Sequence, residues 1–323
     1  MTADMEKRKR MAVFSGSSNL KLADEIAREI GISLGNVKLE KFANGEIYAR
    51  FDETVRGCDV FFVQSIVGKN VNDLMMETLI VADAAHRASA RSVTAVIPHY
   101  AYARQDRKAG PREPITARLV ANLLECAGVD RVITLDLHQG QIEGFFDVPV
   151  NHLTALPLFG QYFMNKNFDW ENTVVVSPDV GRAKACKKLS DQLGCDLAIA
   201  HKGRPHHNQA EVMGIIGDIK DKTCIINDDM IDTAGTLCAA IRELKQRGVW
   251  IFGTAADGAV PLYSADLKGP VAIVIGNEGV GMSRIVADSC DFKVSIPMKG
   301  RISSLNASAA AAILLYEAVR QRG

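Results

Sequence analysis

The strongest constraint on the fold is a regular alternation of short β-branched runs with longer helical patterns along most of the chain. In the helical stretches, apolar residues recur every three or four positions. Such alternation predicts right-handed crossovers and largely parallel sheets with helices on both faces. The expected strands span residues 59–65, 92–97, 132–138, 173–179, 196–202 and 223–229, and the expected helices span 72–88, 115–128 and 235–248.

Composition limits the kinds of partner. The 323 residues are enough for two domains with separate cores. Basic and acidic residues balance at 38 each, so bulk attraction to RNA or to an anionic membrane is not expected, and anions must be bound by local clusters. Seven scattered cysteines and the lack of an apolar run of about 20 residues predict a soluble, cytoplasmic protein with buried thiols and no membrane partner.

The most informative motif is "IINDDMIDTAGT", residues 225–236. An apolar strand ends in Asp228 and Asp229, and a loop of small and hydroxyl residues then opens a helix. Backbone N–H groups at a helix N-terminus can bind a phosphate, and the carboxylates suit ribose hydroxyls or Mg²⁺. The structural alternative is an N-cap turn with acids that face solvent.

Polar residues also follow the other predicted strands, where ligands of parallel sheets bind. These candidates are Arg104, Gln105, Asp106, Lys108, His138, Asp179, Lys202 and Arg204. Taken alone, each pattern has a structural interpretation: a surface charge run, a hydrogen-bonded histidine or an exposed cationic loop. The "NGE" tripeptide at Asn44 is likewise typical of a plain β-turn.

Together these residues carry a family resemblance. In order and in motif, residues 42–57, 99–119, 135–153, 174–181 and 202–219 resemble the ribose-phosphate pyrophosphokinases, and the likeness extends over about residues 11–247. The resemblance implies tandem type I phosphoribosyltransferase-like parallel-sheet domains. It also implies transfer of the diphosphoryl group of Mg-ATP to the C1 hydroxyl of ribose 5-phosphate, which gives phosphoribosyl pyrophosphate and AMP.

The resemblance assigns roles to particular residues. It implies that His138 and Asp179 hold Mg²⁺ and that Lys202 and Arg204, on a closing loop, stabilise transition-state charge. It further implies a homo-oligomer with ATP and ribose 5-phosphate as its small-molecule substrates. The implied ATP-binding residues are Phe42, Asn44, Glu46, Arg104, Gln105, Asp106 and Lys108, and the implied ribose-5-phosphate residues are Asp228, Asp229, Asp232, Thr233, Ala234, Gly235 and Thr236.

Two positions depart from the family pattern. Gly203 stands where a second arginine is common, and Arg182 stands where the diphosphate loop usually has a small residue. The first change removes a cation, while the second adds a guanidinium that can still meet a phosphate.

After Gly248 the chain instead resembles the C-terminal half of the knotted SpoU-type RNA 2′-O-ribose methyltransferases, from about residue 246 to the end. The catalytic arginine motif of that family's N-terminal half has no counterpart in residues 1–247. We therefore expect a vestigial cofactor motif, with neither S-adenosylmethionine nor RNA as a ligand. Its residues are Gly276, Asn277, Glu278, Gly279, Ile296, Met298, Ser304, Leu305 and Asn306.

The sequence thus predicts an α/β chimera joined at "ELKQRGVWIFG". We expect an ATP-side domain at 1–152, a partial ribose-5-phosphate domain at 153–247 and a methyltransferase-like segment at 248–323, which either completes the second domain or follows it as half of a SPOUT knot. Three functions remain open: an active diphosphokinase, an inactive or structural chimera of that fold, and an RNA methyltransferase that works through the tail.

Overall fold

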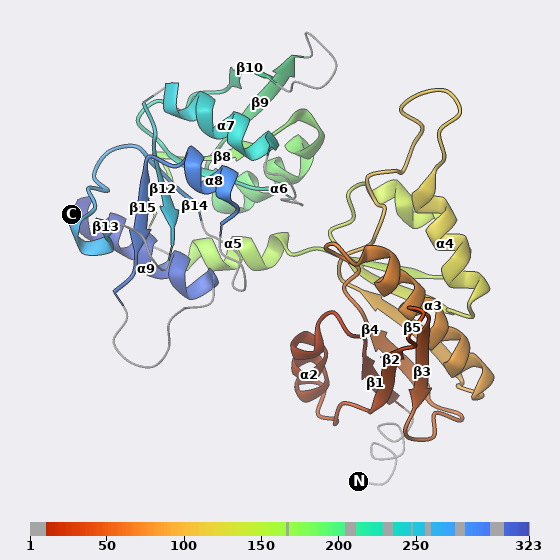
Figure 1. Ribbon diagram of the computed structural model, residues 1–323. Coiled ribbons are helices and arrows are strands. Elements are labelled where there is room, and N and C mark those ends of the chain that lie inside the picture. Colours follow the sequence, from red (N-terminus) through yellow and green to blue (C-terminus); the bar gives the residue numbers. More distant parts are fainter. Residues whose placement is uncertain are drawn as a thin grey trace. The chain divides into compact units, whose positions relative to one another are not determined.

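The computed structural model describes residues 11–165, 168–203, 211–228, 235–246, 248–255, 260–274, 282–297 and 307–322. The chain divides into two compact units, Met1–Ala155 (unit 1) and Leu156–Gly323 (unit 2), shown together in Figure 1. The first unit ends at Ala155, two residues after its last strand.

Unit 1 is built on a parallel five-stranded sheet in the order β1-β4-β5-β6-β7. A parallel sheet needs a crossover between successive strands, and helices supply most of these connections. The strands are β1 (Met11–Ser15), β4 (Asp59–Val63), β5 (Ser92–Ile97), β6 (Arg131–Leu135) and β7 (Val150–Leu153).

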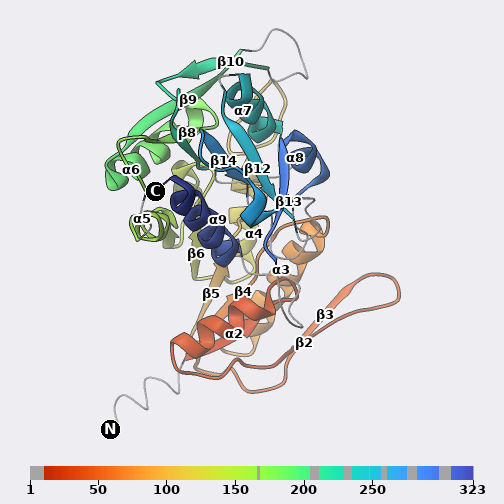
Figure 2. The same ribbon diagram turned by 90° about the vertical axis from the view of Figure 1, so that its left-hand side faces the viewer.

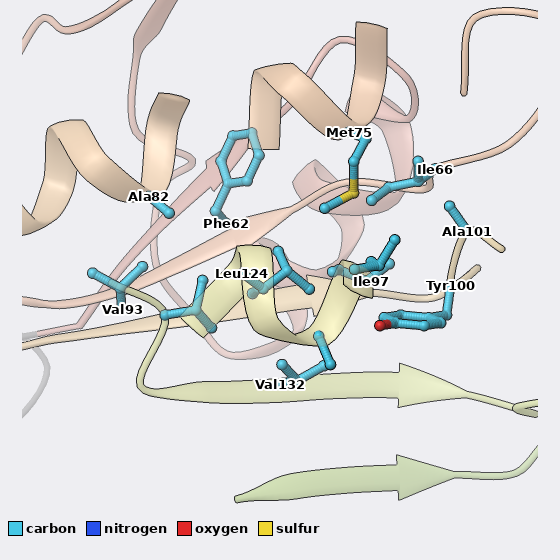
Figure 3. Close-up of a cluster of buried hydrophobic side chains, with 14 of the residues drawn as sticks. Phe62, Ile66, Met75, Ala82, Val93, Ile97, Tyr100, Ala101, Leu124 and Val132 are labelled. Atoms are coloured by element: carbon cyan, nitrogen blue, oxygen red, sulfur yellow. The ribbon is translucent and has the colours of Figure 1, made fainter. Parts of the chain in front are cut away.

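Helices cover both faces of this sheet, as the alternation predicts. On one face, Val13 packs with Ala23 and Ala27 of α2 (Leu20–Glu29). The neighbouring Phe14 points to the opposite face, into the cluster formed with α3 (Val71–Arg87) and α4 (Thr116–Cys126). Figure 3 shows part of that cluster, and burying each large apolar side chain there stabilises the unit by about 1.5–3 kcal/mol.

An antiparallel hairpin projects from unit 1. Its strands, β2 (Val37–Lys41) and β3 (Ile47–Phe51), pair from Val37 opposite Phe51 to Lys41 opposite Ile47. Figure 2 shows the turn between them at the end of the projection. The pattern of predicted strands did not include this hairpin.

Unit 2 contains two four-stranded sheets. In the first, β9 (Asp196–Gly203), β8 (Thr173–Ser177) and β11 (Thr223–Ile226) are parallel neighbours, and β10 (Glu211–Ile216) is antiparallel to β9. The second is parallel throughout, in the order β13-β15-β12-β14. Its strands are β12 (Trp250–Thr254), β13 (Val260–Pro261), β14 (Val271–Val274) and β15 (Phe292–Ser295).

The first sheet of unit 2 is also covered on both faces. Val175 faces α5 (Leu156–Met164) and α6 (Ala183–Leu193), whereas Val174 and Val176 face the cluster that contains α7 (Gly235–Gln246). In the methyltransferase-like part, α8 (Arg284–Ser289) packs beside α7 (Figure 1), and α9 (Ala307–Arg322) is the last helix. Short 3-10 helices η1 (Gly140–Phe145), η2 (Val180–Arg182) and η3 (Leu262–Ser264) lie in the connections.

One hydrophobic core crosses the junction between the two family resemblances. Val174 of β8 and Ile241 of α7 belong to the same buried cluster as Ile251 of β12 and Val286 of α8. The fit is close at Gly253, where an added Cβ would come within 2.6 Å of Cys290 Sγ and 2.7 Å of Met282 Cε. The tail thus brings its own sheet yet shares a core with the phosphoribosyltransferase-like part.

All six predicted strands and all three predicted helices form, but some strands are shorter than predicted. β6 ends at Leu135 rather than at residue 138, because Asp136 adopts a left-handed backbone with φ of 43°. β8 ends at Ser177 rather than at residue 179, and Pro178, which follows it, has no N–H to extend a strand ladder. His138 and Asp179 therefore lie in loops beyond their strands. Within the described ranges, no helix is long and apolar enough to span a bilayer.

A buried carboxylate fastens the C-terminal helix. Glu317 of α9 is 2% exposed and accepts hydrogen bonds from Arg320 Nε at 2.8 Å, Arg320 Nη2 at 2.7 Å and Gln321 Nε2 at 2.9 Å. Gln321 Nε2 also donates to Ala265 O at 2.8 Å, and its Oε1 accepts from Leu267 N at 2.8 Å. The Arg320 hydrogen bonds lower the pKa of Glu317 to about 2.

Glu317→Gln is expected to lower the melting temperature at pH 7 by about 2–4 °C, because it removes a charge-assisted hydrogen bond from Arg320. Since the folded pKa is depressed, this stabilisation is complete above about pH 4.5 and is lost as the pH falls towards 2. Thermal melts between pH 7 and pH 3 should show the deficit of the variant shrinking. The exposed Glu171→Gln serves as control, and a deficit independent of pH would contradict the role of the charge.

Candidate functional site

Three predicted residues lie at the carboxyl edge of the first sheet of unit 2. Ser177 of β8 pairs with Ile199 of β9, and Val176 pairs with Ile226 of β11, so the ends of these parallel strands are level. Lys202, Asp179 and Asp228 follow these positions by two or three residues. The fold therefore places Asp179, Asp228 and the backbone of Lys202 at the ends of three adjacent strands.

The loop after β8 is tightly built. Asp179 caps η2, with its Oδ1 accepting from Arg182 N at 3.0 Å, and Ser177 Oγ donates to Asp179 O at 2.6 Å. A Cβ on Gly181 would lie 3.2 Å from Asp179 Oδ1, so the backbone passes close to the carboxylate. The unusual Arg182 thus contributes its amide to the cap, while its half-buried side chain stays beside the loop.

The end of β11 is fixed by a buried amide. Asn227 is 7% exposed, its N–H donates to Val176 O at 3.4 Å, and its side chain and carbonyl both contact the thiol of Cys186 on α6. Burial raises the pKa of Cys186, the nearby Asp228 carboxylate raises it further, and Arg182 opposes the shift. The contacts of Asn227 fix the backbone just before the half-buried Asp228.

The helix behind the predicted ribose-5-phosphate loop begins at Gly235, so Gly235 and Thr236 form the first turn of α7. Lys202 lies in β9, with its backbone paired to Val212 of β10. Several predicted residues lie outside the described residues: Asp229, Asp232, Thr233, Ala234 and Arg204.

In unit 1, the predicted nucleotide residues follow β5. Arg104 and Lys108 are exposed and Asp106 is half-buried. Gln105 is anchored to the start of α4: its Oε1 accepts from Thr116 Oγ1 at 2.5 Å, and its carbonyl accepts from Ala117 N at 3.2 Å. The glutamine therefore holds the loop on the helix, with charged neighbours on either side.

His138 follows the adjacent strand β6, on a loop held at Asp136. The Asp136 carboxylate accepts from Thr154 Oγ1 at 2.7 Å and from Ala155 N at 3.1 Å, which ties the loop to the segment after β7. His138 itself is half-buried. Because β5 and β6 are neighbours, the Arg104 loop and His138 share one edge of the sheet.

A second histidine supports the same loop. Leu137 N donates to His152 Nε2 at 3.0 Å, and His152 Nδ1 lies 2.6 Å from Glu143 Oε1. Because His152 Nε2 accepts this hydrogen bond, the ring proton is assigned to Nδ1, which donates a hydrogen bond to Glu143 Oε1. Sequence reasoning singled out His138 but not this support, because no local motif links residues 137, 143 and 152.

Phe42, Asn44 and Glu46 form the tip of the projecting hairpin. Asn44 Oδ1 accepts from Glu46 N at 3.2 Å, and Gly45, with φ of 91°, allows the tight turn. Phe42 is 56% exposed, with its ring centroid 5.9 Å from that of Tyr48. An exposed ring held by a second aromatic side chain is suited to stacking on a planar base.

Of the predicted tail motif, Ile296 lies within the described residues. Ile296 is half-buried and packs against the cluster formed by Phe252, Val294 and Leu314. The remaining predicted cofactor residues of the tail lie outside the described residues: Gly276, Asn277, Glu278, Gly279, Met298, Ser304, Leu305 and Asn306.

Sequence reasoning missed the polar residues that precede the predicted site residues. Ser177 is the last residue of β8, and Asp136 and Asn227 directly follow β6 and β11; each precedes a predicted site residue by one or two positions. A polar residue at the end of an apolar run could have indicated these positions from the sequence, since a buried polar side chain needs a hydrogen-bond partner. Among the described residues, no group of three or more His, Cys, Asp or Glu side chains could hold a metal ion by itself.

This geometry is that of phosphoribosyltransferase-type α/β proteins, with loops at the carboxyl edges of parallel sheets. Residues 11–128 match the model of the N-terminal domain of ribose phosphate pyrophosphokinase, and residues 157–257 match that of the phosphoribosyl transferase domain. Residues 229–316 match the SpoU rRNA methylase family. The SpoU match begins before residue 246, where the sequence resemblance was expected to start, so residues 229–257 match both families.

Similar proteins point to the same family as the first two models. The chain is 52% identical over 236 residues to ribose-phosphate pyrophosphokinase of Fusobacterium nucleatum, covering 73% of this chain and 74% of that protein. It is 50% identical over 240 residues to that of Bacillus subtilis, covering 74% and 75%. The crystal structure of phosphoribosylpyrophosphate synthetase from Mycobacterium smegmatis aligns with a TM-score of 0.70 at 36% identity, over 97% of this chain and 100% of that one. The chain therefore belongs to the ribose-phosphate pyrophosphokinase family and carries a SpoU-like C-terminal segment.

Proposed function

We propose that this protein is a ribose-phosphate diphosphokinase that uses Mg-ATP and ribose 5-phosphate. The observation that carries the proposal is the convergence of Lys202, Asp179 and Asp228 on three adjacent strand ends, in a chain about 50% identical to such enzymes over three quarters of its length. In this reaction the C1 hydroxyl of ribose 5-phosphate attacks the β-phosphorus of ATP. The new bond joins O1 to that phosphorus, and the bond to the α-phosphate oxygen breaks to release AMP.

We assign separate binding roles to different groups of residues. Asp228 and the start of α7 are proposed to hold ribose 5-phosphate through its hydroxyls and phosphate. Arg104, Gln105, Asp106 and Lys108, with the hairpin tip, are proposed to bind ATP. His138 and Asp179 suit Mg²⁺ as imidazole and carboxylate donors, and when bound the ion would neutralise phosphate charge. With no three-residue cage among the described side chains, phosphate oxygens would complete its coordination.

The proposed division of labour follows the sequence. Residues 1–152 would form the ATP side, residues 153–247 the ribose-5-phosphate side, and residues 248–323 a structural segment. Support for the last assignment is the core that β12 and α8 share with α7. All seven cysteines are free, which supports placing the protein in the reducing cytoplasm.

The direct test is release of AMP from ATP, dependent on ribose 5-phosphate, by the full chain. Lys202→Ala is expected to slow turnover by about 10²–10³-fold with ATP affinity nearly unchanged, because its charge is needed mainly in the transition state. The matched control is Lys220→Ala, an exposed lysine of the same unit, with turnover expected to be unchanged. No AMP from the wild type would refute the activity and would favour the inactive chimera, while equal turnover in the two variants would refute the role of Lys202.

We further propose that the enzyme is a homo-oligomer. Two features of unit 1 support this: the projecting hairpin with its exposed Phe42, and an apolar stripe formed by Leu119 and Leu123 of α4 with Ile115, the N-cap residue of that helix, each at least 37% exposed. Such a stripe is covered when a second copy packs on it. Sedimentation velocity is expected to show a species larger than the 35.0 kDa monomer. Leu119→Asp should shift the distribution towards the monomer, and a strictly monomeric wild type would contradict the proposal.

The alternative of an RNA 2′-O-ribose methyltransferase rests on the SpoU match of the tail. Because the match covers only residues 229–316, we expect no S-adenosylmethionine binding. Isothermal calorimetry of the full chain with S-adenosylmethionine should give no heat above the dilution control. Saturable binding would revive this alternative.

A further inference from the structure

A single buried thiol connects the two strand ends of unit 2 that carry Asp179 and Asp228. Cys186 lies on α6 and is 0% exposed. Its Sγ donates to the carbonyl oxygen of Asn227 at 3.4 Å, and Asn227 Nδ2 donates back to the sulfur at 3.8 Å. This reciprocal pair fastens α6 to the residue that immediately precedes Asp228.

The helix that carries this thiol continues directly from the other loop. Asp179 caps η2 (Val180–Arg182), α6 begins at the next residue, Ala183, and Ser177 Oγ donates to the carbonyl oxygen of Asp179 at 2.6 Å. A connection therefore runs from the Asp179 loop through the start of α6 and the Cys186–Asn227 hydrogen bonds to the end of β11. Cys186 is 0% and Asn227 7% exposed, so water does not compete for these contacts.

The electrostatic setting keeps this connection neutral. Burial raises the pKa of the Cys186 thiol above its ordinary value, and this outweighs the opposing effects of the Asn227 hydrogen bond and of Arg182. The group therefore remains a protonated donor at neutral pH and adds no negative charge near bound phosphates.

We propose that Cys186 is a positioning residue that fixes the Asp179 loop and the Asp228 strand end relative to each other, so that ribose 5-phosphate is held for attack. This inference rests on the proposed function and goes beyond it by assigning a role to a residue outside the loops that would touch the substrates. Displacing a reacting group by about 1 Å can cost as much as about 100-fold in rate, so a small shift at this connection has a large effect.

The experiment compares Cys186→Ala and Cys186→Ser with Cys224→Ala as the matched control. Cys224 is also a buried thiol of unit 2, but its Sγ contacts only Lys222 O, at 3.9 Å, among its hydrogen bonds in the structure. Cys186→Ala is expected to raise the KM for ribose 5-phosphate about tenfold and the KM for ATP less than twofold. Cys186→Ser, which keeps a donor, should recover most of the loss, and Cys224→Ala should lower only the melting temperature.

A double-mutant cycle separates positioning from stability. If Cys186 acts through Asn227, then Cys186→Ala combined with Asn227→Ala should change the KM for ribose 5-phosphate no more than the larger single change. Additive changes in KM, an unchanged KM in Cys186→Ala, or equal effects in Cys186→Ala and Cys224→Ala would overturn the proposal. If Cys186→Ala fails to fold, Cys186→Ser and Asn227→Ala carry the same comparison.

A binding measurement distinguishes failure of this proposal from failure of the proposed function. Calorimetric titration with ribose 5-phosphate alone requires no turnover. A wild type that binds ribose 5-phosphate but forms no AMP would refute the diphosphokinase activity, and a tenfold weaker affinity in Cys186→Ala would still support the positioning role. Equal affinities in the wild type and Cys186→Ala would refute that role whatever the activity.

Discussion

The junction between the two sheets of unit 2 depends on one hydrophobic cluster. Val174 and Val176 of β8 pack there with Ile241 and Leu244 of α7, and Ile251 of β12 completes the same cluster. The strand ends that carry Asp179 and Asp228 can be level only if β8 and β11 are held rigidly, and this packing supplies that rigidity. Polar contacts at the strand ends then adjust a geometry that the apolar core has already set.

Much of the fold could be predicted from the sequence, and the errors in that prediction have physical causes. Runs such as 173–179 predicted buried strands because β-branched residues alternate with helical patterns, but local conformation at Asp136 and the Pro178 ring set where strands end. The β2–β3 hairpin was missed because its strands are only partly buried and its residues mix charged and apolar types. Contacts such as Cys186 with Asn227 join residues 41 positions apart, and no local pattern encodes them.

The double family match over residues 229–257 explains how the two parts fit together. This stretch contains α7 and β12, a helix followed by a parallel strand. Both family models match this helix and this strand, and in the structure the helix packs on the phosphoribosyltransferase-like sheet while the strand belongs to the methyltransferase-like sheet. Shared local structure therefore preserves the direction of the chain, and the common core preserves its packing.

The close contact at Gly253 joins separate elements of the tail. An added Cβ would come within 2.6 Å of Cys290 Sγ and 2.7 Å of Met282 Cε, so a larger residue at position 253 requires one or both of these side chains to shift. Met282 and Cys290 in turn pack against the cluster that contains Val174 and Ile241. Through these two side chains, a change of shape at a single backbone position in the tail is passed on to the packing behind the phosphoribosyltransferase-like sheet.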